Sequence, residues 1–335
     1  MQTAKPNVYA SARAPGKLIL AGEHFVVLGA PAVSMAINLY AFATAQATAD
    51  GDLKVEANIP LSTLSEGERK SRPDTNELLE PFRLAARESL DSLDRRGRGV
   101  SVEIECQIPI GAGLGSSAAT AVAIIAATSR AYGARLDKSR ICQIAFGPES
   151  YLHGSPSGVD HATSTYGGLI QFSKPDKVKQ IKLKRMPTLL VCDTNVHRST
   201  KGLVGSVVKR ARADSEGYRS RVGEVSQISE SVVRALRRND DVELGELMNR
   251  NHELLVQIGV SHPMLNKLVS ASRKAGALGA KMTGAGGGGC MIALCKDEKE
   301  ASRIGSRLRR IGGSPYLVSL DPTGVVSSTN STVLK

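Results

Sequence analysis

The sequence has few aromatic residues, no long apolar run and no paired cysteine motif. Aromatic residues make up 4% of the 335 residues, and tryptophan is absent. No apolar run approaches the ~18 residues that cross a bilayer, and the first fifteen residues lack the apolar core of a secretory signal. The five cysteines contain no C-x-x-C pair, which disfavours a zinc site or a disulfide framework. These absences predict a cytoplasmic protein that does not enter a membrane.

The formal charge of the chain is strongly positive, at +12. A nucleic-acid-binding protein usually carries a concentrated basic patch, a reader motif or aromatic residues on which bases stack. Here Lys and Arg are spread along the chain, and the other two features are missing. We therefore expect solvated helix faces that attract small anionic molecules, and no nucleic-acid partner.

Length and pattern predict two domains that each mix helices with strands. A chain of 335 residues is too long to fold around one small hydrophobic core. Its 41% hydrophobic and 23% charged residues are typical of globular proteins. A charged, proline-containing stretch at 174–184 is the expected boundary. The predicted fold class is therefore α+β. Expected strands lie at 8–13, 18–21, 42–49, 53–59, 100–108, 189–192, 291–294 and 316–320, and expected helices at 75–95, 116–132, 203–258 (three stretches), 264–275 and 298–310.

The most informative segment is the glycine-rich stretch from Pro109 to Ser117, which follows an expected strand and opens an expected helix. Glycines let the backbone approach a phosphate, and the first N–H groups of a helix attract anions. Ser116 and Ser117 add hydroxyls for a phosphate oxygen or Mg²⁺. No lysine follows the last glycine, so this is not a Walker A loop, and Ser116 replaces the third glycine of a dinucleotide fingerprint. The alternative is a flexible turn before a Ser-capped helix.

A second glycine cluster, Gly284 to Gly289, formally matches the dinucleotide pattern G-x-G-x-x-G. The residues after it, 290–294, are predicted to form a strand, whereas dinucleotide binding requires a helix there. We therefore expect this loop to pack against another loop or against a bound phosphate.

Three motifs stand in a fixed order along the chain: Ala14 to His24, the loop at 109–119, and Lys281 to Gly289. In that order they resemble the three signatures of the GHMP kinases (galactokinase, homoserine kinase, mevalonate kinase and phosphomevalonate kinase), and the resemblance covers nearly the whole chain. It implies a two-domain GHMP kinase fold, with a ribosomal protein S5 domain 2-like N-terminal domain at 1–178 and a ferredoxin-like C-terminal domain at 179–335. It also implies ATP as co-substrate and Mg²⁺ as cofactor.

The resemblance also implies which residues bind ATP and the metal. The ATP phosphates would be bound by the loop residues Gly111, Ala112, Gly113, Leu114, Gly115, Ser116 and Ser117. The Mg²⁺ ligands would be Ser117 and Glu149, since this ion prefers one or two protein oxygens completed by water and phosphate. From the residues alone, Glu149 is equally explained as a first-turn acid that a helix N-terminus after Pro148 stabilises by about 0.5 kcal/mol.

Within the family, the segments 148–160 and 193–201 most resemble those of the mevalonate kinases. The resemblance implies transfer of the γ-phosphoryl group of ATP to the 5-hydroxyl of mevalonate, in isoprenoid biosynthesis. Asp160 would take the hydroxyl proton or orient the hydroxyl, and Lys17 would pair with Asp160 and stabilise the transferred phosphoryl oxygens. Without the resemblance, Asp160 could cap a helix after Gly158, and Lys17 could be a solvated lysine in a turn.

The acceptor side of the site is assigned by the same resemblance. It places Glu23, His24 and Thr200 beside mevalonate, and a protonated His24 could pair with the carboxylate of the acceptor. Cys106, His153 and His252 are expected to be structural. The family also implies a homodimer.

Other functions stay open at this point. One is another member of the family: phosphomevalonate kinase, a kinase for a different mevalonate hydroxyl, or the related decarboxylase. Another is a catalytically silent ligand-binding sensor on the same fold, which would be expected to lose Lys17, Glu149 or Asp160, and all three are present. Salt-dependent RNA binding is the weakest alternative.

Overall fold

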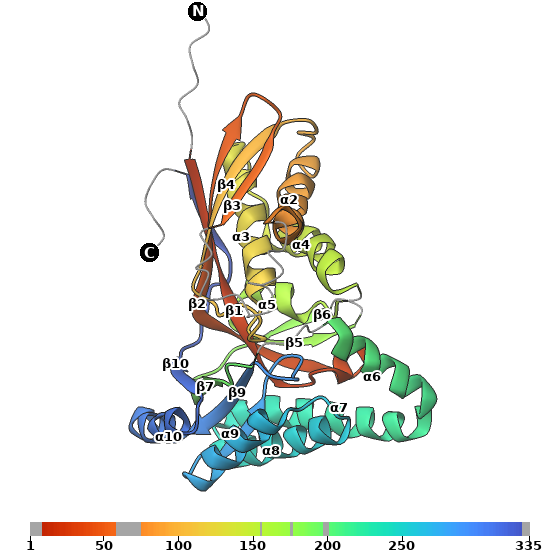
Figure 1. Cartoon of the computed structure of the whole chain (residues 1–335), viewed down its shortest axis with the longest axis vertical. Coiled ribbons are helices and arrows are strands. Elements are labelled where there is room, and N and C mark those ends of the chain that lie inside the picture. Colours follow the sequence, from red (N-terminus) through yellow and green to blue (C-terminus); the bar gives the residue numbers. More distant parts are fainter. Residues whose placement is uncertain (1–8, 58–74, 155, 175–176, 197–200, 330–335) are drawn as a thin grey trace, which may run out of the picture.

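The computed structural model describes residues 9–57, 75–154, 156–174, 177–196 and 201–329. Within these ranges the chain forms two sheets, each packed against helices (Figure 1). The upper part of Figure 1 contains the first sheet, and the lower part contains the second, with the chain crossing between them after the first half. The α+β fold class predicted from the sequence is confirmed.

The N-terminal sheet has the strand order β11-β1-β2-β4-β3, and β5 joins it by pairing with β2 and β6. Its strands are β1 (Tyr9–Ala21), β2 (Ala32–Thr48), β3 (Leu53–Ala57), β4 (Gly99–Cys106), β5 (Leu169–Ser173), β6 (Lys177–Ile181) and β11 (Val326–Thr329). All neighbours are antiparallel except β3 and β4, which run parallel. The helical elements of this half are η1 (Phe25–Leu28), α2 (Thr75–Asp91), α3 (Ser116–Ala131), α4 (Lys138–His153) and α5 (Val159–Tyr166).

Helix α3 is the central helix of the N-terminal half. Every residue from Ala118 to Ser129 is buried, because α3 packs against β1 and β2 on one side and against α2, α4 and α5 on others. An alanine-rich helix that is apolar on all sides is expected in such a position. The core thus fixes the helix and holds its N-terminus, at Ser116, where the glycine-rich loop ends.

The C-terminal sheet has the strand order β10-β7-β9-β8 and is antiparallel throughout. Its strands are β7 (Thr188–Asp193), β8 (Gly279–Met282), β9 (Cys290–Cys295) and β10 (Ser314–Val318). Helices α6 (Lys201–Ala213), α7 (Ser215–Arg238), α8 (Asp241–Gln257) and α9 (Pro263–Lys274) connect β7 to β8, and α10 (Glu298–Arg310) connects β9 to β10. This β-α-β-β-α-β order confirms the expected ferredoxin-like arrangement.

The last described residues return to the first sheet. Strand β11 pairs with β1, from Arg13 opposite Val326 to Ala10 opposite Thr329. Strand β6 lies inside the stretch 174–184 that was expected to be a boundary. The division into 1–178 and 179–335 stays a prediction, and the pairing of β11 with β1 shows that residues from both ranges share a sheet.

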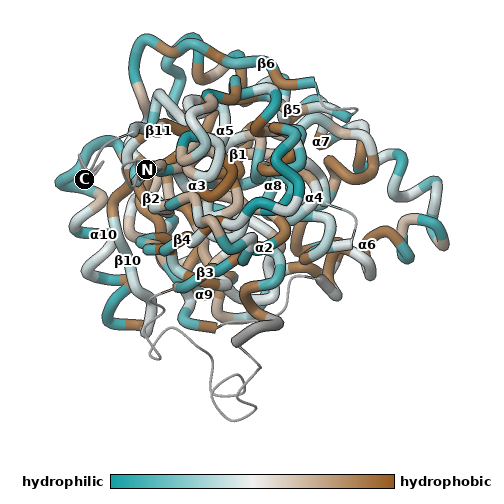
Figure 2. The backbone as a smooth tube through the Cα atoms, turned by 90° about the horizontal axis from the view of Figure 1, so that it is seen from above, coloured by the Kyte–Doolittle hydropathy of each residue, from teal (hydrophilic) through white to brown (hydrophobic). Residues whose placement is uncertain are grey.

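Hydrophilic and hydrophobic residues are interspersed along the chain. In Figure 2, hydrophilic and hydrophobic stretches alternate along the tube, as expected for helices and strands with one buried face. Helix α10 is an example: Ala301, Ile304 and Leu308 are buried, while Arg307 and Arg310 are exposed. Within the described ranges, no helix combines the length and the apolarity needed to cross a membrane.

Candidate active site

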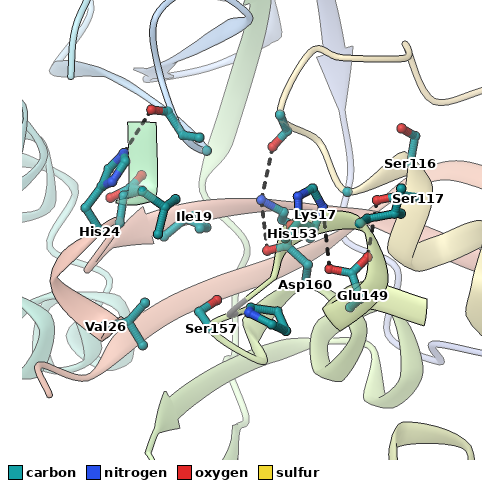
Figure 3. A pocket seen from close by; sticks show the side chains of 18 of the residues that line it. Lys17, Ile19, His24, Val26, Ser116, Ser117, Glu149, His153, Ser157 and Asp160 are labelled. Atoms are coloured by element: carbon teal, nitrogen blue, oxygen red, sulfur yellow. Dashed lines mark hydrogen bonds and ion pairs between the residues drawn. The ribbon is translucent and has the colours of Figure 1, made fainter. Parts of the chain in front are cut away.

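A cavity of about 290 Å³ lies where the two halves of the chain meet. Its walls come from β1 and the turn after it, from the glycine-rich loop and the start of α3, from α4 and α5, and from the second glycine cluster. Figure 3 shows Lys17 and Asp160 in the middle of this pocket, with His24 on one side and Ser117 and Glu149 on the other. All three sequence motifs therefore contribute to one site.

Lys17 and Asp160 form an ion pair in the centre of the pocket. Lys17 Nζ lies 3.1 Å from Asp160 Oδ1, and it donates a hydrogen bond to the carbonyl oxygen of Gly113 at 3.0 Å. Lys17 is 2% exposed, whereas the Asp160 side chain is 31% exposed and accessible to a ligand. Asp160 does not cap α5, because Gly158 is the N-cap residue and no side chain among the described residues caps that helix. The pairing predicted from the sequence is confirmed.

Gly115 makes room for the Lys17 side chain. Its φ is +77°, and a Cβ atom at this position would lie 2.9 Å from Lys17 Cγ. Only glycine adopts that conformation without strain and leaves the space that Lys17 occupies. The loop therefore shapes the position of Lys17 as well as the start of α3.

Ser117 and Glu149 form a second polar pair beside the first. Ser117 Oγ donates to Glu149 Oε1 at 3.2 Å, joining the start of α3 to α4. Burial raises the pKa of Glu149 to about 8, and the nearby charge of Asp160 acts in the same direction, while Ser117 and Lys17 oppose the shift. Glu149 lies near the C-terminal end of α4. The dipole at a helix N-terminus therefore does not explain a carboxylate at this position.

The Ser117–Glu149 pair fits a magnesium site. Both residues supply oxygen, the donor that Mg²⁺ prefers, and a divalent cation would offset the cost of two carboxylates, Glu149 and Asp160, facing one pocket. In the described ranges no group of three or more His, Cys, Asp or Glu residues could hold a metal ion. Two protein oxygens are nevertheless sufficient for Mg²⁺, because water and phosphate oxygens complete its shell.

The glycines and serines of the glycine-rich loop line the pocket, whereas two other residues of the loop do not. Gly111, Gly113, Gly115, Ser116 and Ser117 line the pocket. Ala112 and Leu114 are buried and line the core instead. Their carbonyl oxygens accept hydrogen bonds from the backbone N–H groups of Cys290 and Lys17, respectively.

The N-terminus of α3 offers free donors to an anion. Gly115 is the N-cap residue, and no described side chain caps the helix. The first N–H groups of a helix have no partner within the helix, so those of α3 are available to a phosphate. The alternative of a Ser-capped helix is therefore wrong, since neither serine is the cap.

The second glycine cluster closes against the first loop. A Cβ atom at Gly284 would lie 2.7 Å from the carbonyl oxygen of Gly113, and one at Gly289 would lie 2.8 Å from that of Ala112. The N–H of Cys290 donates to the Ala112 carbonyl at 3.0 Å. Strand β9 begins directly after the cluster, at Cys290, as predicted, so this is not a dinucleotide site.

Glu23 and His24, which are expected beside the acceptor, follow the end of β1 and line the pocket. Glu23 Oε1 accepts a hydrogen bond from Lys281, and the two side chains form a fully buried ion pair. His24 Nε2 donates to the carbonyl oxygen of Ala285 at 2.8 Å. Burial lowers the pKa of His24, and the positive charge of Arg210 lowers it further, so a protonated His24 is not favoured.

Thr200 lies outside the described residues, so its expected place beside the acceptor stays a prediction. One residue that lines the pocket was missed by the sequence reasoning, and so was Lys281, which pairs with Glu23 behind the pocket wall. His153 was expected to be structural, yet it lines the pocket, and its Nε2 lies 3.9 Å from Glu149 Oε2. The signal was its position four residues after Glu149, on the same face of a helix. Lys281 was visible only as part of a motif.

Comparisons with known proteins identify the family of the chain. Residues 81–168 match the family model of the GHMP kinases N terminal domain, and residues 232–313 match that of the GHMP kinases C terminal. The mevalonate kinase of Thermococcus gammatolerans is 38% identical over 94% of this chain and 97% of its own length. That of Pyrococcus furiosus is also 38% identical, with the same two coverages.

Solved structures show the same relationship. L. major mevalonate kinase in complex with R-mevalonate has a TM-score of 0.78 and 30% sequence identity, covering 96% of this chain and 97% of that one. Methanococcus jannaschii mevalonate kinase has a TM-score of 0.77 and 27% identity, covering 93% and 98%. The chain belongs to the GHMP kinase family, and the relatives named here are all mevalonate kinases.

Proposed function

We propose that the protein transfers the γ-phosphoryl group of ATP to the 5-hydroxyl of mevalonate, a step of isoprenoid biosynthesis. Its relatives carry this activity in their names, and one of them was solved with R-mevalonate bound. The observation in this chain that supports the proposal most directly is the Lys17–Asp160 pair. It lies between a phosphate-binding helix start and a separate set of polar groups for the acceptor.

In the proposed reaction, Asp160 receives the proton of the 5-hydroxyl as the oxygen attacks phosphorus. Its carboxylate is exposed to the pocket and is within reach of a ligand. Lys17 orients that carboxylate and places a positive charge beside the phosphoryl oxygens that gain charge in the transition state. Because Lys17 also donates to the carbonyl oxygen of Gly113, its ammonium group is held at a fixed position relative to the glycine-rich loop.

Gly111, Gly113, Gly115 and Ser116 are proposed to bind the phosphates of ATP through backbone N–H groups and the Ser116 hydroxyl. Ser117 and Glu149 are the proposed Mg²⁺ ligands. When bound, the ion neutralises phosphate charge and aligns the β- and γ-phosphates for transfer. His153, beside Glu149 Oε2, restrains the carboxylate from the other side.

The remaining assignments are proposals that rest on the family resemblance or on the composition of the sequence. They are Glu23, His24 and Thr200 at the acceptor, a homodimer, a cytoplasmic location, and no role for nucleic acid. Gel filtration with light scattering tests the dimer, and a filter-binding assay with unrelated RNA at low and high salt tests the last point.

The decisive experiment measures ADP release with Mg-ATP and four acceptors: mevalonate, phosphomevalonate, galactose and homoserine. We expect turnover on mevalonate alone, and phosphorus NMR of the product should show a 5-phosphate. Asp160→Asn should lower kcat by about 10²–10⁴-fold. Asp297→Asn is the matched control, because Asp297 caps α10 outside the pocket and asparagine caps a helix equally well. Preference for phosphomevalonate, or equal activity of the two variants, would contradict the proposal.

A further inference from the structure

The two carboxylate oxygens of Glu149 face different groups. Oε1 accepts the hydrogen bond from Ser117 Oγ at 3.2 Å, whereas Oε2 lies 3.9 Å from His153 Nε2. The Glu149 side chain is only 4% exposed, so neighbouring groups rather than solvent determine its orientation. Figure 3 shows the carboxylate with one contact to Ser117 and another to His153. The two oxygens of Glu149 can therefore have different roles.

Oε1 is the oxygen on the proposed metal side. Ser117 Oγ and Glu149 Oε1 are adjacent, so a cation that both of them bind would take the place of the hydrogen bond between them. The inference rests on the proposed function, in which Ser117 and Glu149 hold Mg²⁺. It concerns the other oxygen, Oε2, and the histidine beside it.

His153 is poorly suited to be a magnesium ligand itself. Mg²⁺ prefers oxygen, whereas imidazole nitrogen suits zinc, copper, iron and nickel. An imidazole N–H can instead donate to a carboxylate that binds a metal and so fix its orientation. The distance of 3.9 Å exceeds the hydrogen-bond range of about 2.7–3.2 Å, so a rotation of the His153 ring must bring the two atoms together. The side chain is 34% exposed and ends α4, which leaves room for that rotation.

We propose that His153 makes the site selective for Mg²⁺ over Ca²⁺, because its bond to Oε2 leaves Glu149 only Oε1 for the metal. The small octahedral shell of Mg²⁺ fits a carboxylate that binds through one oxygen. Ca²⁺ takes about six to eight oxygens and often binds both oxygens of a carboxylate. The two ions carry the same charge, so attraction alone does not separate them. The number of oxygens that Glu149 supplies does.

The position of His153 also has a structural explanation. A histidine in the last turn of a helix can stabilise that helix through its dipole, and His153 is the basic residue in the last turn of α4. Replacing a residue with that role alone would change the stability of the protein and leave its preference among metal ions unchanged. Metal selectivity therefore separates the two explanations.

The test measures how Mg²⁺ and Ca²⁺ displace Mn²⁺ from the protein in the presence of ATP, followed by electron paramagnetic resonance. The ratio of the two half-displacing concentrations is compared between proteins, so the preference of ATP itself cancels. The proteins are the unmodified chain, His153→Leu, His153→Gln and Tyr151→Leu. Leucine has no donor, whereas glutamine keeps an N–H at a similar reach. Tyr151→Leu is the matched control, since Tyr151 lies on the same helix, is 55% exposed and does not line the pocket.

In His153→Leu the ratio should shift towards Ca²⁺ by at least about tenfold. Loss of a group that supports a metal ligand typically costs about 10–100-fold in affinity for the native metal, and Ca²⁺ gains access to the second carboxylate oxygen. His153→Gln should keep most of the preference for Mg²⁺, and Tyr151→Leu should keep all of it. Circular dichroism checks that the four proteins fold alike.

Two results would overturn the proposal while leaving the proposed function intact. One is an unchanged ratio in His153→Leu, which would make His153 structural. The other is an equal loss of affinity for both ions, which would show that His153 supports metal binding without selecting the ion. Glu149→Gln and the turnover of mevalonate with Mg-ATP are measured in parallel. Unchanged Mn²⁺ affinity in Glu149→Gln would overturn both the proposed metal ligands and this inference, and absence of turnover on mevalonate would contradict the proposed function separately.

Discussion

Lys281 and Glu23 form an ion pair in which both side chains are buried, and this pair joins the third sequence motif to the first. Lys281 lies on β8 of the C-terminal sheet, and Glu23 follows β1 of the N-terminal sheet. A neighbouring hydrogen bond, from the N–H of Ile19 to Thr283 Oγ1 at 2.8 Å, crosses the same boundary. This part of the pocket is therefore held together by contacts between the two halves of the chain.

Replacing Lys281 by methionine should strongly destabilise the protein. The substitution leaves the Glu23 carboxylate buried without its partner, and breaking such a pair typically costs about 3–5 kcal/mol in the free energy of unfolding. Urea unfolding followed by circular dichroism measures it. Lys274→Met, at an exposed lysine near the end of α9, should change stability by less than about 0.5 kcal/mol. Similar unfolding midpoints for the two variants would contradict the importance of the ion pair.

The stability of the metal-free protein should fall as pH rises from about 4.5 to about 8. Burial raises the pKa of Glu149 from 4.5 to about 8 in the folded state. Between these values the folded protein holds a proton that the unfolded chain has released, so raising the pH favours unfolding. The loss is at most on the order of 5 kcal/mol. Glu149→Gln should flatten this part of the curve, and a variant curve parallel to that of the unmodified chain would argue against the shift.

Divalent metal binding should depend on the same proton. A metal ion can bind the Glu149 carboxylate only after the proton leaves, so apparent affinity should rise about tenfold per pH unit up to about pH 8 and then level off. Mn²⁺, titrated by electron paramagnetic resonance in the presence of ATP, provides the measurement. In Glu149→Gln the affinity should be weaker and independent of pH in this range. A pH-independent affinity in the unmodified protein would exclude Glu149 as a ligand.

Gly115→Ala should damage activity more than a glycine substitution with the same backbone conformation elsewhere. The added Cβ would lie 2.9 Å from Lys17 Cγ and would displace the lysine from Asp160. Gly133, at the other end of α3, has a φ of +76° and open space around it, so Gly133→Ala carries the backbone strain alone. Both variants should lose about 1 kcal/mol of stability to that strain. Only Gly115→Ala should lower kcat, and equal kcat values would show that the contact with Lys17 is unimportant.

Local signals in the sequence predicted α2, α3 and the helices of the C-terminal half, but they did not predict α4 or α5. The alanine-rich segment at 116–132 became α3 almost residue for residue, and the strand after the second glycine cluster was placed correctly. The metal-side and catalytic residues came from a resemblance of motifs, and the structure places all of them in one pocket. Motifs of this kind are predictable because each carries its chemistry within a few residues.

Features that depend on distant contacts were not predictable. Strand β11 forms only because β1 offers it an edge, and its four residues carry no strong strand signal of their own. The expected strand at 42–49 is the second half of β2, which begins at Ala32. Burial lowers the pKa of His24, although the contact with the carbonyl of Ala285, more than 250 residues away, acts in the opposite direction. Spacing in the sequence does not reveal such tertiary effects.

Lys17 and Asp160 should act as a single unit in the reaction. Lys17 positions the carboxylate through the 3.1 Å ion pair, and Asp160 fixes the lysine beside the phosphate loop. Asp160→Asn and Lys17→Met should each lower kcat by about 10²–10⁴-fold. The double variant should be no worse than the poorer single variant, because residues that work as a unit do not have additive effects. Single-turnover measurements with saturating ATP and mevalonate isolate the chemical step. If the two losses multiply in the double variant, then Lys17 and Asp160 contribute independently, and Lys17 acts on the phosphoryl group without positioning Asp160.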